Sequence, residues 1–400
     1  MTELLAPVRD EISFRAAIEA GADAVYFGLG HLNMRVNSKG IDPDMLEEIV
    51  GEAHSKDVKV YVTLNAVIFD EEIETVDKLL GQCKQASIDA IICWDPAVIE
   101  LAQKHDIEIH ISTQASISNA RAANYYKTLG ATRIVPAREL SLEQIKTLKA
   151  NSNVEVEVFV HGAMCVSVSG RCFMSQFLEN RSANRGDCLQ PCRANYKVTN
   201  TETGSELEVS NGYVMSPKDL CGLPVLDEIL ATGVDALKIE GRSRSPEYIK
   251  MVVSVYRRAI DAIEAGKFDE ALVEELMADL KKVYNRGFSD GFLHGRPGPQ
   301  QWADRRNSQA TEKKLFVGKL INFFRNTNIA HCKISSGVLK TGDRVQIHGF
   351  KTGVYEMVMG EMRDDDSNVV TEMSKGNVTF HSEKVIRRND QVYKIVPVDA

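Results

Sequence analysis

The sequence predicts an α/β protein built on a parallel (β/α)8 barrel of the TIM type, followed by a small separate β-barrel. Three observations predict it: strand-like and helix-like segments alternate over the first 242 residues, eight segments are strand-like, and helical patterns end before about residue 315. Such alternation requires a parallel sheet, because parallel strands are joined by long crossovers, usually helices. An open doubly wound sheet is the alternative, but the chain lacks its G-x-G-x-x-G fingerprint.

The eight strand-like segments are short, regularly spaced and rich in β-branched and aromatic residues. They are Glu3–Pro7, Ala24–Gly28, Val58–Asn65, Ala90–Asp95, Glu108–Gln114, Arg133–Glu139, Val154–Gly162 and Ala236–Gly241. Helical patterns lie between most of them, and the one that begins at Ser141 opens with a spacing close to a capping box. Glycines such as Gly21 and Gly130 provide the left-handed stop before the next strand. This order matches a barrel whose reactive groups lie at the carboxyl ends of the strands.

A long insertion, residues 163–235, separates the seventh and eighth strands. It leaves the seventh strand at its carboxyl end, which is the functional face of such a barrel. After the eighth strand, Ser245 and Pro246 begin the first of two closing helices, with Ser as cap and Pro at the first position. We therefore expect the barrel domain to span residues 1–293.

The rest of the chain is predicted to form a linker and a second domain. Residues 294–314 are polar, contain two prolines and show no apolar periodicity, which is typical of a linker. Residues 315–400 contain closely spaced strands with Gly and Asp turns, which predicts a small β-barrel. Its segment Thr341–Val345 is similar to the β-barrel of translation elongation factors, which suggests a domain that contacts RNA.

Composition and charge are those of an ordinary globular protein. Hydrophobic residues make up 44% and charged residues 26% of the chain, which excludes disordered and collagen-like classes. No apolar run reaches the roughly 20 residues that cross a bilayer, and the first residues lack a signal-peptide profile, so we expect a cytoplasmic protein without a membrane partner. The net charge of −8 argues against indiscriminate coating of nucleic acid, so a basic site must be local.

Five of the eight cysteines lie in the insertion, at positions 165, 172, 188, 192 and 221. Thiolates gathered in a reducing compartment most often hold zinc or an iron–sulfur cluster. The first four follow the spacing C-x6-C-x15-C-x3-C, without the paired C-x-x-C of most structural zinc sites. This spacing favours iron and sulfur, with zinc and purely structural cysteines as the alternatives. The other three, Cys83, Cys93 and Cys332, are expected to be buried.

Four stretches around these cysteines carry a specific pattern. They are EVFVHGAMCVSVSGRCFMS at 157–175, NRGDCLQPCR at 184–193, SPKDLC at 216–221 and LKIEGR at 237–242. The pattern resembles the signature of the collagenase-like (U-32) peptidase family, and the likeness extends from the ELLAP opening to the region of Gly287. Despite the name, the most similar members are tRNA hydroxylation proteins, which make 5-hydroxyuridine at the wobble position in a prephenate-dependent reaction. Related members hydroxylate a ribosomal RNA cytidine or the ubiquinone ring.

The resemblance implies a [4Fe–4S] cluster held by Cys165, Cys172, Cys188 and Cys192, with Cys221 as an alternative fourth ligand. It implies an iron–sulfur enzyme that hydroxylates a wobble uridine, with tRNA and prephenate as partners and a second subunit of the same family as a further candidate. The alternatives are a peptidase, as the family name says, hydroxylation of another RNA or small molecule, and a non-catalytic cluster scaffold within a complex. Oxygen insertion commonly uses redox chemistry, whereas amide hydrolysis requires no cluster.

Polar residues at or near the predicted strand ends extend the candidate site. They are Asn65, Asp95, Gln114, Arg138, Glu139, Glu157, His161, Lys238, Glu240 and Arg242. We assign Arg138, Lys238 and Arg242 to binding of carboxylates or phosphate, because cations, and the Arg fork above all, suit these anions. Glu157 or His161 is assigned to proton transfer, for which an imidazole pKa near neutrality is suited.

Bland interpretations of these polar residues stay open. The charged residues can instead form buried ion pairs, Arg138 with Glu139 or Glu157 and Lys238 with Glu240. Arginines near the cysteines either contact RNA phosphates or form a solvated loop that offsets the charge of a cluster. These are Arg171, Arg181, Arg185 and Arg193. Serines 167, 169 and 175 lack a G-x-S-x-G elbow, so a serine hydrolase mechanism is disfavoured.

Overall fold

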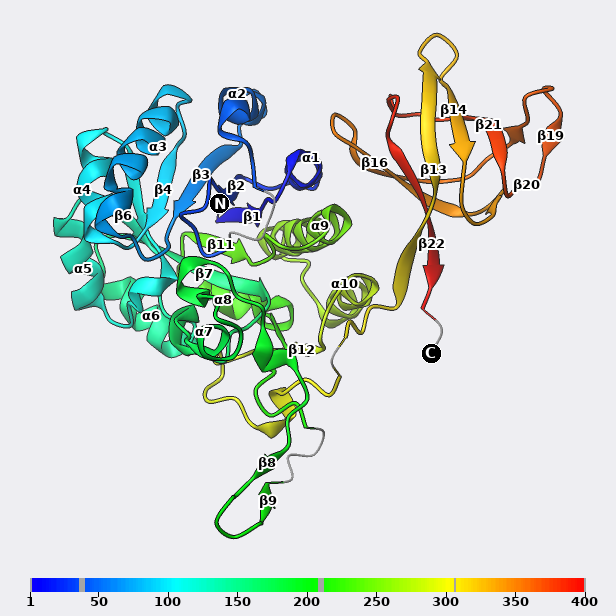
Figure 1. Ribbon diagram of the computed structural model, residues 1–400. Helices are drawn as coiled ribbons and strands as arrows, with labels where there is room; N and C mark the ends of the chain where they lie inside the picture. Colours follow the sequence, from blue (N-terminus) through cyan, green and yellow to red (C-terminus); the bar gives the residue numbers. More distant parts are fainter. Residues whose placement is uncertain (1, 36–39, 208–211, 306, 399–400) are drawn as a thin grey trace.

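The computed structural model describes residues 2–35, 40–207, 212–305 and 307–398, and its first part is a closed parallel barrel (Figure 1). Seven strands follow one another in chain order, and the ring closes because β11 pairs in parallel with both β1 and β7. The strands are β1 Glu3–Pro7, β2 Ala24–Gly28, β3 Lys59–Leu64, β4 Ala90–Cys93, β5 Glu108–Ile111, β6 Ala131–Ile134, β7 Glu155–Gly162 and β11 Ala236–Ile239. The predicted TIM-like fold is confirmed.

Helices cover the outside of the barrel, and their apolar faces pack with outward-facing strand residues in one continuous core. They are α1 Glu11–Glu19, α2 Leu46–His54, α3 Ile73–Gln85, α4 Pro96–Lys104, α5 Ala120–Thr128, α6 Leu142–Asn151, α8 Leu226–Ala231, α9 Pro246–Glu264 and α10 Glu270–Lys282. In the capping box at α6, the Ser141 side chain accepts a hydrogen bond from the Gln144 amide, and the Gln144 side chain accepts one from the Ser141 amide. Across the residues placed in the structure, no helix combines the length and apolarity needed to span a bilayer.

The insertion between β7 and β11 lies over the carboxyl ends of the barrel strands. It contains the short helix α7 Met174–Glu179, the hairpin β8 Val198–Thr199 and β9 Glu206–Leu207, and the strand β10 Asp219–Cys221. Strand β10 runs antiparallel to β7 and parallel to β12 Phe288–Ser289, so the sheet extends beyond the ring at this point. The insertion is thereby held against the barrel and also against the chain that follows the closing helices.

The segment expected as a linker is hydrogen-bonded to the barrel domain along its length. The Ala303 amide donates to Ser216 O at 2.7 Å, and the Gln309 amide donates to Asn285 O at 2.8 Å. Strand β13, Glu312–Phe324, then begins inside the expected linker range.

The C-terminal part is an eight-stranded antiparallel sheet around a separate core. Besides β13 it contains β14 Ile329–Ile334, β16 Arg344–Gly349, β17 Gly353–Val358, β18 Met362–Arg363, β19 Val369–Val370, β21 Gly376–His381 and β22 Gln391–Pro397, with the pair β15 Leu339–Lys340 and β20 Glu372–Met373 beside it. We predicted a small β-barrel here, and in the placed part of this domain the strands form an antiparallel sheet whose outer strands are β17 and β19. The barrel domain covers the β17 edge, because Lys250 donates to Val354 O at 2.5 Å and Arg15 donates to Phe350 O.

Candidate functional site

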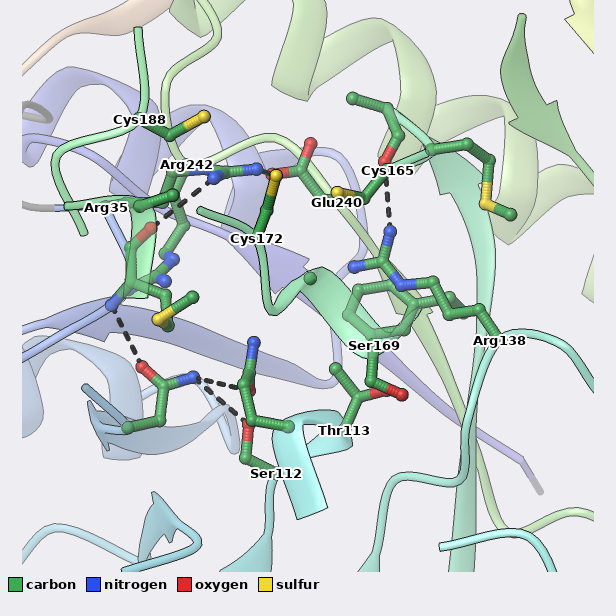
Figure 2. Close-up of a pocket in the computed structure, with 18 of the residues that line it drawn as sticks. Arg35, Ser112, Thr113, Arg138, Cys165, Ser169, Cys172, Cys188, Glu240 and Arg242 are labelled. Carbon is green, nitrogen blue, oxygen red and sulfur yellow. Dashed lines mark hydrogen bonds and ion pairs between the residues drawn. The ribbon is translucent and has the colours of Figure 1, made fainter. Parts of the chain in front are cut away.

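A pocket opens where the barrel strands end, and the cysteine-bearing insertion forms its other wall (Figure 2). The strand ends contribute aromatic and charged side chains, and the insertion contributes four thiols. The residues used below are Tyr26, Arg138, Phe159, Lys238, Glu240 and Arg242 from the barrel and Cys165, Cys172, Cys188 and Cys192 from the insertion. This is the face on which TIM barrels carry reactive groups. The structure therefore brings together the four cysteines and the three cations that the sequence selected.

The four pocket cysteines have surroundings that suit thiolate ligands. Backbone amides donate to sulfur at two of them, Ser167 N to Cys165 Sγ at 3.5 Å and Met174 N to Cys172 Sγ at 3.3 Å. Figure 2 shows Cys165, Cys172 and Cys188 along the same side of the pocket. Hydrogen bonds to sulfur stabilise thiolates and tune iron–sulfur clusters. The donor set is soft and includes no histidine among the placed residues that line the pocket, so it fits an iron–sulfur cluster better than a hard cation.

The sulfur atoms share the pocket without converging on one point. Within the placed part of the chain, no three His, Cys, Asp or Glu side chains gather closely enough to hold a metal ion. Burial raises the pKa of Cys192, which favours its thiol form when no metal is bound.

Cys221 lies apart from the other four. It is buried on β10, with its sulfur 3.9 Å from the Tyr256 hydroxyl and 3.7 Å from the Met277 sulfur, in the core beneath α9 and α10. Burial raises its pKa to about 11, so the thiol stays protonated. Its surroundings are those of a structural cysteine. Cys83, Cys93 and Cys332 are buried, as the sequence predicts.

Two cations face the pocket, Arg138, which is half-buried, and Arg242, which is buried. Arg138 stacks on Phe159, with 3.8 Å from its guanidinium carbon to the ring centre, and its Nη1 donates to Ala163 O at 3.0 Å. Arg242 donates to the Thr63 hydroxyl at 2.6 Å and to an oxygen of Asn33 at 3.0 Å. Burial lowers both pKa values, that of Arg242 to about 10. Neither cation forms an ion pair among the placed residues, so a bound anion would supply the missing counter-charge.

The buried ion pairs differ from those that the sequence suggested. Lys238 contacts Glu157 at 2.6 Å rather than Glu240, because Glu157 lies on the neighbouring strand and faces the barrel interior. Glu240 pairs at 3.0 Å with Arg35, which the sequence analysis missed because it lies in a loop and not at a strand end. Although burial alone raises the pKa of Glu240, the charges of Arg35, Arg244 and Arg138 together outweigh that effect and lower it to about 2. Arg138 pairs with neither Glu139 nor Glu157.

Glu157 does not lie at the strand end where we expected it. It is the third residue of β7, fully buried and absent from the pocket lining, and Arg133 contacts its second oxygen at 3.2 Å. Although burial alone raises the pKa of Glu157, the charges of Lys238 and Arg133 outweigh it and keep the carboxylate ionised. Its position and partners are those of a structural anion below the pocket.

His161 is near the strand end but lies outside the pocket lining. A β-bulge in β7 leaves Val160 without a partner on β11, since Lys238 pairs with Phe159 and Ile239 with His161. The imidazole then packs among the rings of Tyr248, Tyr256 and Phe288. Burial lowers its pKa to about 3, so the ring is uncharged at neutral pH. The expectation of a pKa near neutrality is therefore wrong.

A polar network forms the pocket floor. Asn65 donates to the Ser112 hydroxyl at 3.1 Å and to the Gln114 side-chain oxygen at 3.2 Å. The second bond fixes the orientation of the Gln114 side-chain amide. The Ser169 hydroxyl is buried and has no hydrogen-bond partner among the placed residues, and Ser169 N donates to Glu139 at 3.1 Å. Asp95, by contrast, caps α4 and has a structural role.

Three of the four arginines near the cysteines are tied to the protein. Arg185 pairs with Glu72, Arg181 with Asp187, and Arg193 donates to Pro217 O at 2.7 Å. Among the placed residues, Arg171 contacts the Ser116 hydroxyl, at 2.9 Å, and the Trp94 ring. Neither Arg171 nor Arg193 forms an ion pair with a carboxylate among the placed residues, but Arg193 is held by three neutral oxygens and Arg171 by one.

Comparisons with known proteins assign the chain to one family. The sequence profile described as peptidase family U32 matches residues 11–303. The "Collagenase" of Porphyromonas gingivalis is 38% identical over 405 residues, which cover 98% of this chain and 97% of that protein. The "tRNA hydroxylation protein P1" of Bacillus subtilis is 33% identical and covers 92% of this chain and 88% of its own. The "23S rRNA 5-hydroxycytidine C2501 synthase" of Escherichia coli is 36% identical and covers 74% of this chain and 46% of its own.

Proposed function

The chain belongs to peptidase family U32, and we propose that it is an RNA hydroxylation enzyme. The single observation that carries the proposal is the composition of the pocket, in which four cysteines lie beside Arg138, which is half-buried, and Arg242, which is buried, and neither arginine forms an ion pair among the placed residues. Soft ligands next to an anion site suit redox chemistry on an anionic substrate. Relatives named as hydroxylating tRNA and ribosomal RNA support the same reaction class.

We assign a [4Fe–4S] cluster to Cys165, Cys172, Cys188 and Cys192. A cluster of this kind, when bound, supplies one-electron redox chemistry at the mouth of the barrel. The backbone amides of Ser167 and Met174 already donate to two of the four sulfurs, and Cys221 is held away by its burial in the core. Because the sulfurs of the placed residues share the pocket without converging, the loop that carries these cysteines would have to draw them together to hold a cluster.

Prephenate is the proposed small-molecule partner, and Arg138 and Arg242 bind its carboxylates. Both guanidiniums are held by hydrogen bonds to neutral oxygens, which fixes their planes and leaves their charge for a ligand. Lys238 contributes less, because its charge is already balanced by Glu157. Asn65 fixes the orientation of the Gln114 side chain at the floor of the pocket. The Gln114 NH2 group can therefore donate to a base or to the small molecule.

Within RNA, the proposed target is a wobble uridine of tRNA, which is converted to 5-hydroxyuridine. The full-length similarity to a tRNA hydroxylation protein supports this choice over a ribosomal target, since the ribosomal relative covers a smaller part of this chain. A pocket at the end of a barrel receives one base, so the target nucleotide must leave its stack before it reacts.

The peptidase named in a relative of 38% identity is the second candidate. A serine or cysteine peptidase requires a base within reach of its nucleophile. No histidine is found among the placed residues of the pocket lining, and the hydroxyl of Ser175 contacts the sulfur of Cys188 at 3.8 Å. The pocket therefore offers nucleophiles without the partner that would activate them.

Nucleoside mass spectrometry tests the proposal. We compare tRNA from a strain with the gene, a deletion strain, and deletion strains that carry the intact gene or its Cys172→Ala variant. We expect 5-hydroxyuridine and its derivatives to disappear in the deletion and to return only with the intact gene. Unchanged 5-hydroxyuridine in a deletion strain without a second hydroxylation route would overturn the tRNA assignment, and hydrolysis of a collagen-like peptide by purified protein would support the peptidase.

A further inference from the structure

A second cleft lies directly beside the cysteine pocket. It is lined by Val67, Trp94, Arg171, Phe173 and Asn184, and it shares Met34 and Gln114 with the pocket. We propose that this cleft binds an unpaired nucleotide adjacent to the one in the pocket, by stacking its base between aromatic side chains and pairing its phosphate with Arg171. The proposal rests on the proposed RNA hydroxylation and adds a site outside the reaction pocket.

The cleft and the pocket are joined through three consecutive residues. Cys172 lines the pocket, whereas its neighbours Arg171 and Phe173 line the cleft. The Cys172 amide donates to the Asn184 side chain at 3.0 Å, which fixes this short segment. Because the two sites share Met34 and Gln114 and are lined by consecutive residues, a base in the pocket and a ligand in the cleft would be close neighbours. A single strand with one base in the pocket can therefore place a neighbouring nucleotide in the cleft.

The aromatic groups in the cleft are positioned to stack on a base. The Trp94 indole is held in place because its Nε1 donates to Asn65 O at 3.0 Å. Phe173 is 64% exposed, and its ring lies 6.1 Å from that of Phe177, which is 83% exposed. Two exposed rings side by side form an apolar patch, and contiguous apolar patches on a surface mark binding sites. Stacking on aromatic rings is how proteins bind unpaired bases without reading their sequence.

Charge selects a nucleic acid over an apolar protein partner. Arg171 is the single charged residue among those that line the cleft, its guanidinium lies 5.9 Å from the Trp94 ring centre, and it has no ion pair in the placed parts of the chain. An apolar partner would bury this charge without compensation, which is costly. A phosphate next to a stacked base would pair with it, and the adjoining pocket is cationic as well.

Tryptophan fluorescence tests the proposal directly, because the chain contains two tryptophans, Trp94 and Trp302. The Trp302→Phe variant of the full chain reports on the cleft alone. We titrate it with a single-stranded oligouridine, with duplex RNA of the same length, and with a collagen-like peptide. We expect the single strand to quench Trp94 saturably, and at a lower concentration than the duplex or the peptide, since only unpaired bases can stack in the cleft.

A second variant separates stacking from non-specific attraction. Phe173→Ala should raise the concentration of single strand needed for half-maximal quenching by roughly 5- to 150-fold, the range expected for one lost base stack. Phe324→Ala is the matched control, because it removes another exposed ring, 47% accessible, from the C-terminal sheet. It should leave the titration unchanged. Phe173 is exposed, so its loss should not unfold the protein.

The outcomes distinguish this proposal from the proposed reaction. Saturable quenching by the single strand, weakened by Phe173→Ala, supports the cleft even if 5-hydroxyuridine is unchanged in the deletion strain. Equal titrations of the parent and Phe173→Ala would overturn the cleft even if hydroxylation is confirmed. Tighter quenching by the peptide than by RNA would also overturn it and would mark the cleft as a polypeptide site.

Discussion

The ammonium group of Lys238 lies 2.6 Å from the carboxylate of Glu157, and both side chains are buried in the barrel interior. Arg133 contacts the other oxygen of Glu157 and also reaches Glu3 and Glu155, so the pair belongs to a buried network beneath the pocket. The charge of Lys238, the cation next to the pocket floor, is therefore balanced by this network. The charges left for a substrate are those of the arginines.

Removing the Glu157 carboxylate should destabilise the protein strongly. Glu157→Gln leaves two buried cations short of a counter-charge, and loss of one partner of a buried pair costs about 3 to 5 kcal/mol of unfolding free energy. Glu155→Gln is the control, because that side chain is 49% exposed and also pairs with Arg133. It should cost less than about 1 kcal/mol. Urea unfolding measures both, and equal costs would contradict the proposed role of burial.

His161 should make stability depend on pH. Its pKa is about 3 in the folded protein and near 6.5 when unfolded, so the unfolded chain binds one more proton between these values. Stability is therefore lost as the pH falls below 6.5, by about 2 kcal/mol at pH 5. His161→Phe should remove this share of the pH dependence when unfolding is measured at pH 7 and pH 5. The same change at the exposed His381 should leave the dependence intact. If the unfolding free energy of His161→Phe falls between pH 7 and pH 5 as much as that of the parent, burial of His161 is not the cause of this pH dependence.

Single serine substitutions should separate the pocket cysteines from Cys221. We expect anaerobically purified protein to be brown and to contain iron and sulfide, and we expect Cys165→Ser, Cys172→Ser, Cys188→Ser and Cys192→Ser to lose both. Cys221→Ser should retain them, because its sulfur faces Tyr256 and Met277 and not the pocket. Metal analysis and visible absorption provide the readout. Stoichiometric zinc without sulfide, or loss of iron in Cys221→Ser, would refute the assignment.

Binding of prephenate should depend on the two arginines of the pocket. Arg138→Gln and Arg242→Gln should each weaken binding roughly 10- to 100-fold, the effect of losing a hydrogen bond to a charged group. Arg171→Gln, in the adjoining cleft, should leave it unchanged. Calorimetric titration of each purified variant measures this. Parent-like affinity in both pocket variants would mean that the dicarboxylate binds elsewhere.

The sequence predicted the barrel well because its signals are local and repeated. Each strand of Val, Ile and aromatic residues is followed by a helix, and the insertion is recognised by its length alone. The four pocket cysteines could likewise be selected, because they lie close together in the chain and resemble a known signature. Their shared pocket follows from the position of the insertion at the carboxyl end of β7.

The side-chain partners could not be predicted, because they depend on register and local irregularity. A single extra residue at Val160 re-aims His161 from the barrel toward α9, and no sequence pattern marks that bulge. The predicted strand already ended at Gly162, but Glu157 was grouped with the strand-end residues although it lies near the start of β7. Arg35 reaches Glu240 from a loop 205 residues away in the chain, so only the folded structure shows the pair.

The attachment of the insertion to later residues sets an order of events during synthesis. Pro217 forms a bridge with Trp302, β10 pairs with β12, and Arg286 donates to the Gln190 side chain at 2.9 Å. The Arg286 contact holds the loop between Cys188 and Cys192, and the other two hold the later part of the insertion. All three partners are translated long after these cysteines. Because chains emerge at roughly 5 to 20 residues per second, the ribosome adds another hundred residues before this loop can settle. We expect nascent chains that end before Trp302 to lack the contacts that hold the insertion and to leave its thiols exposed.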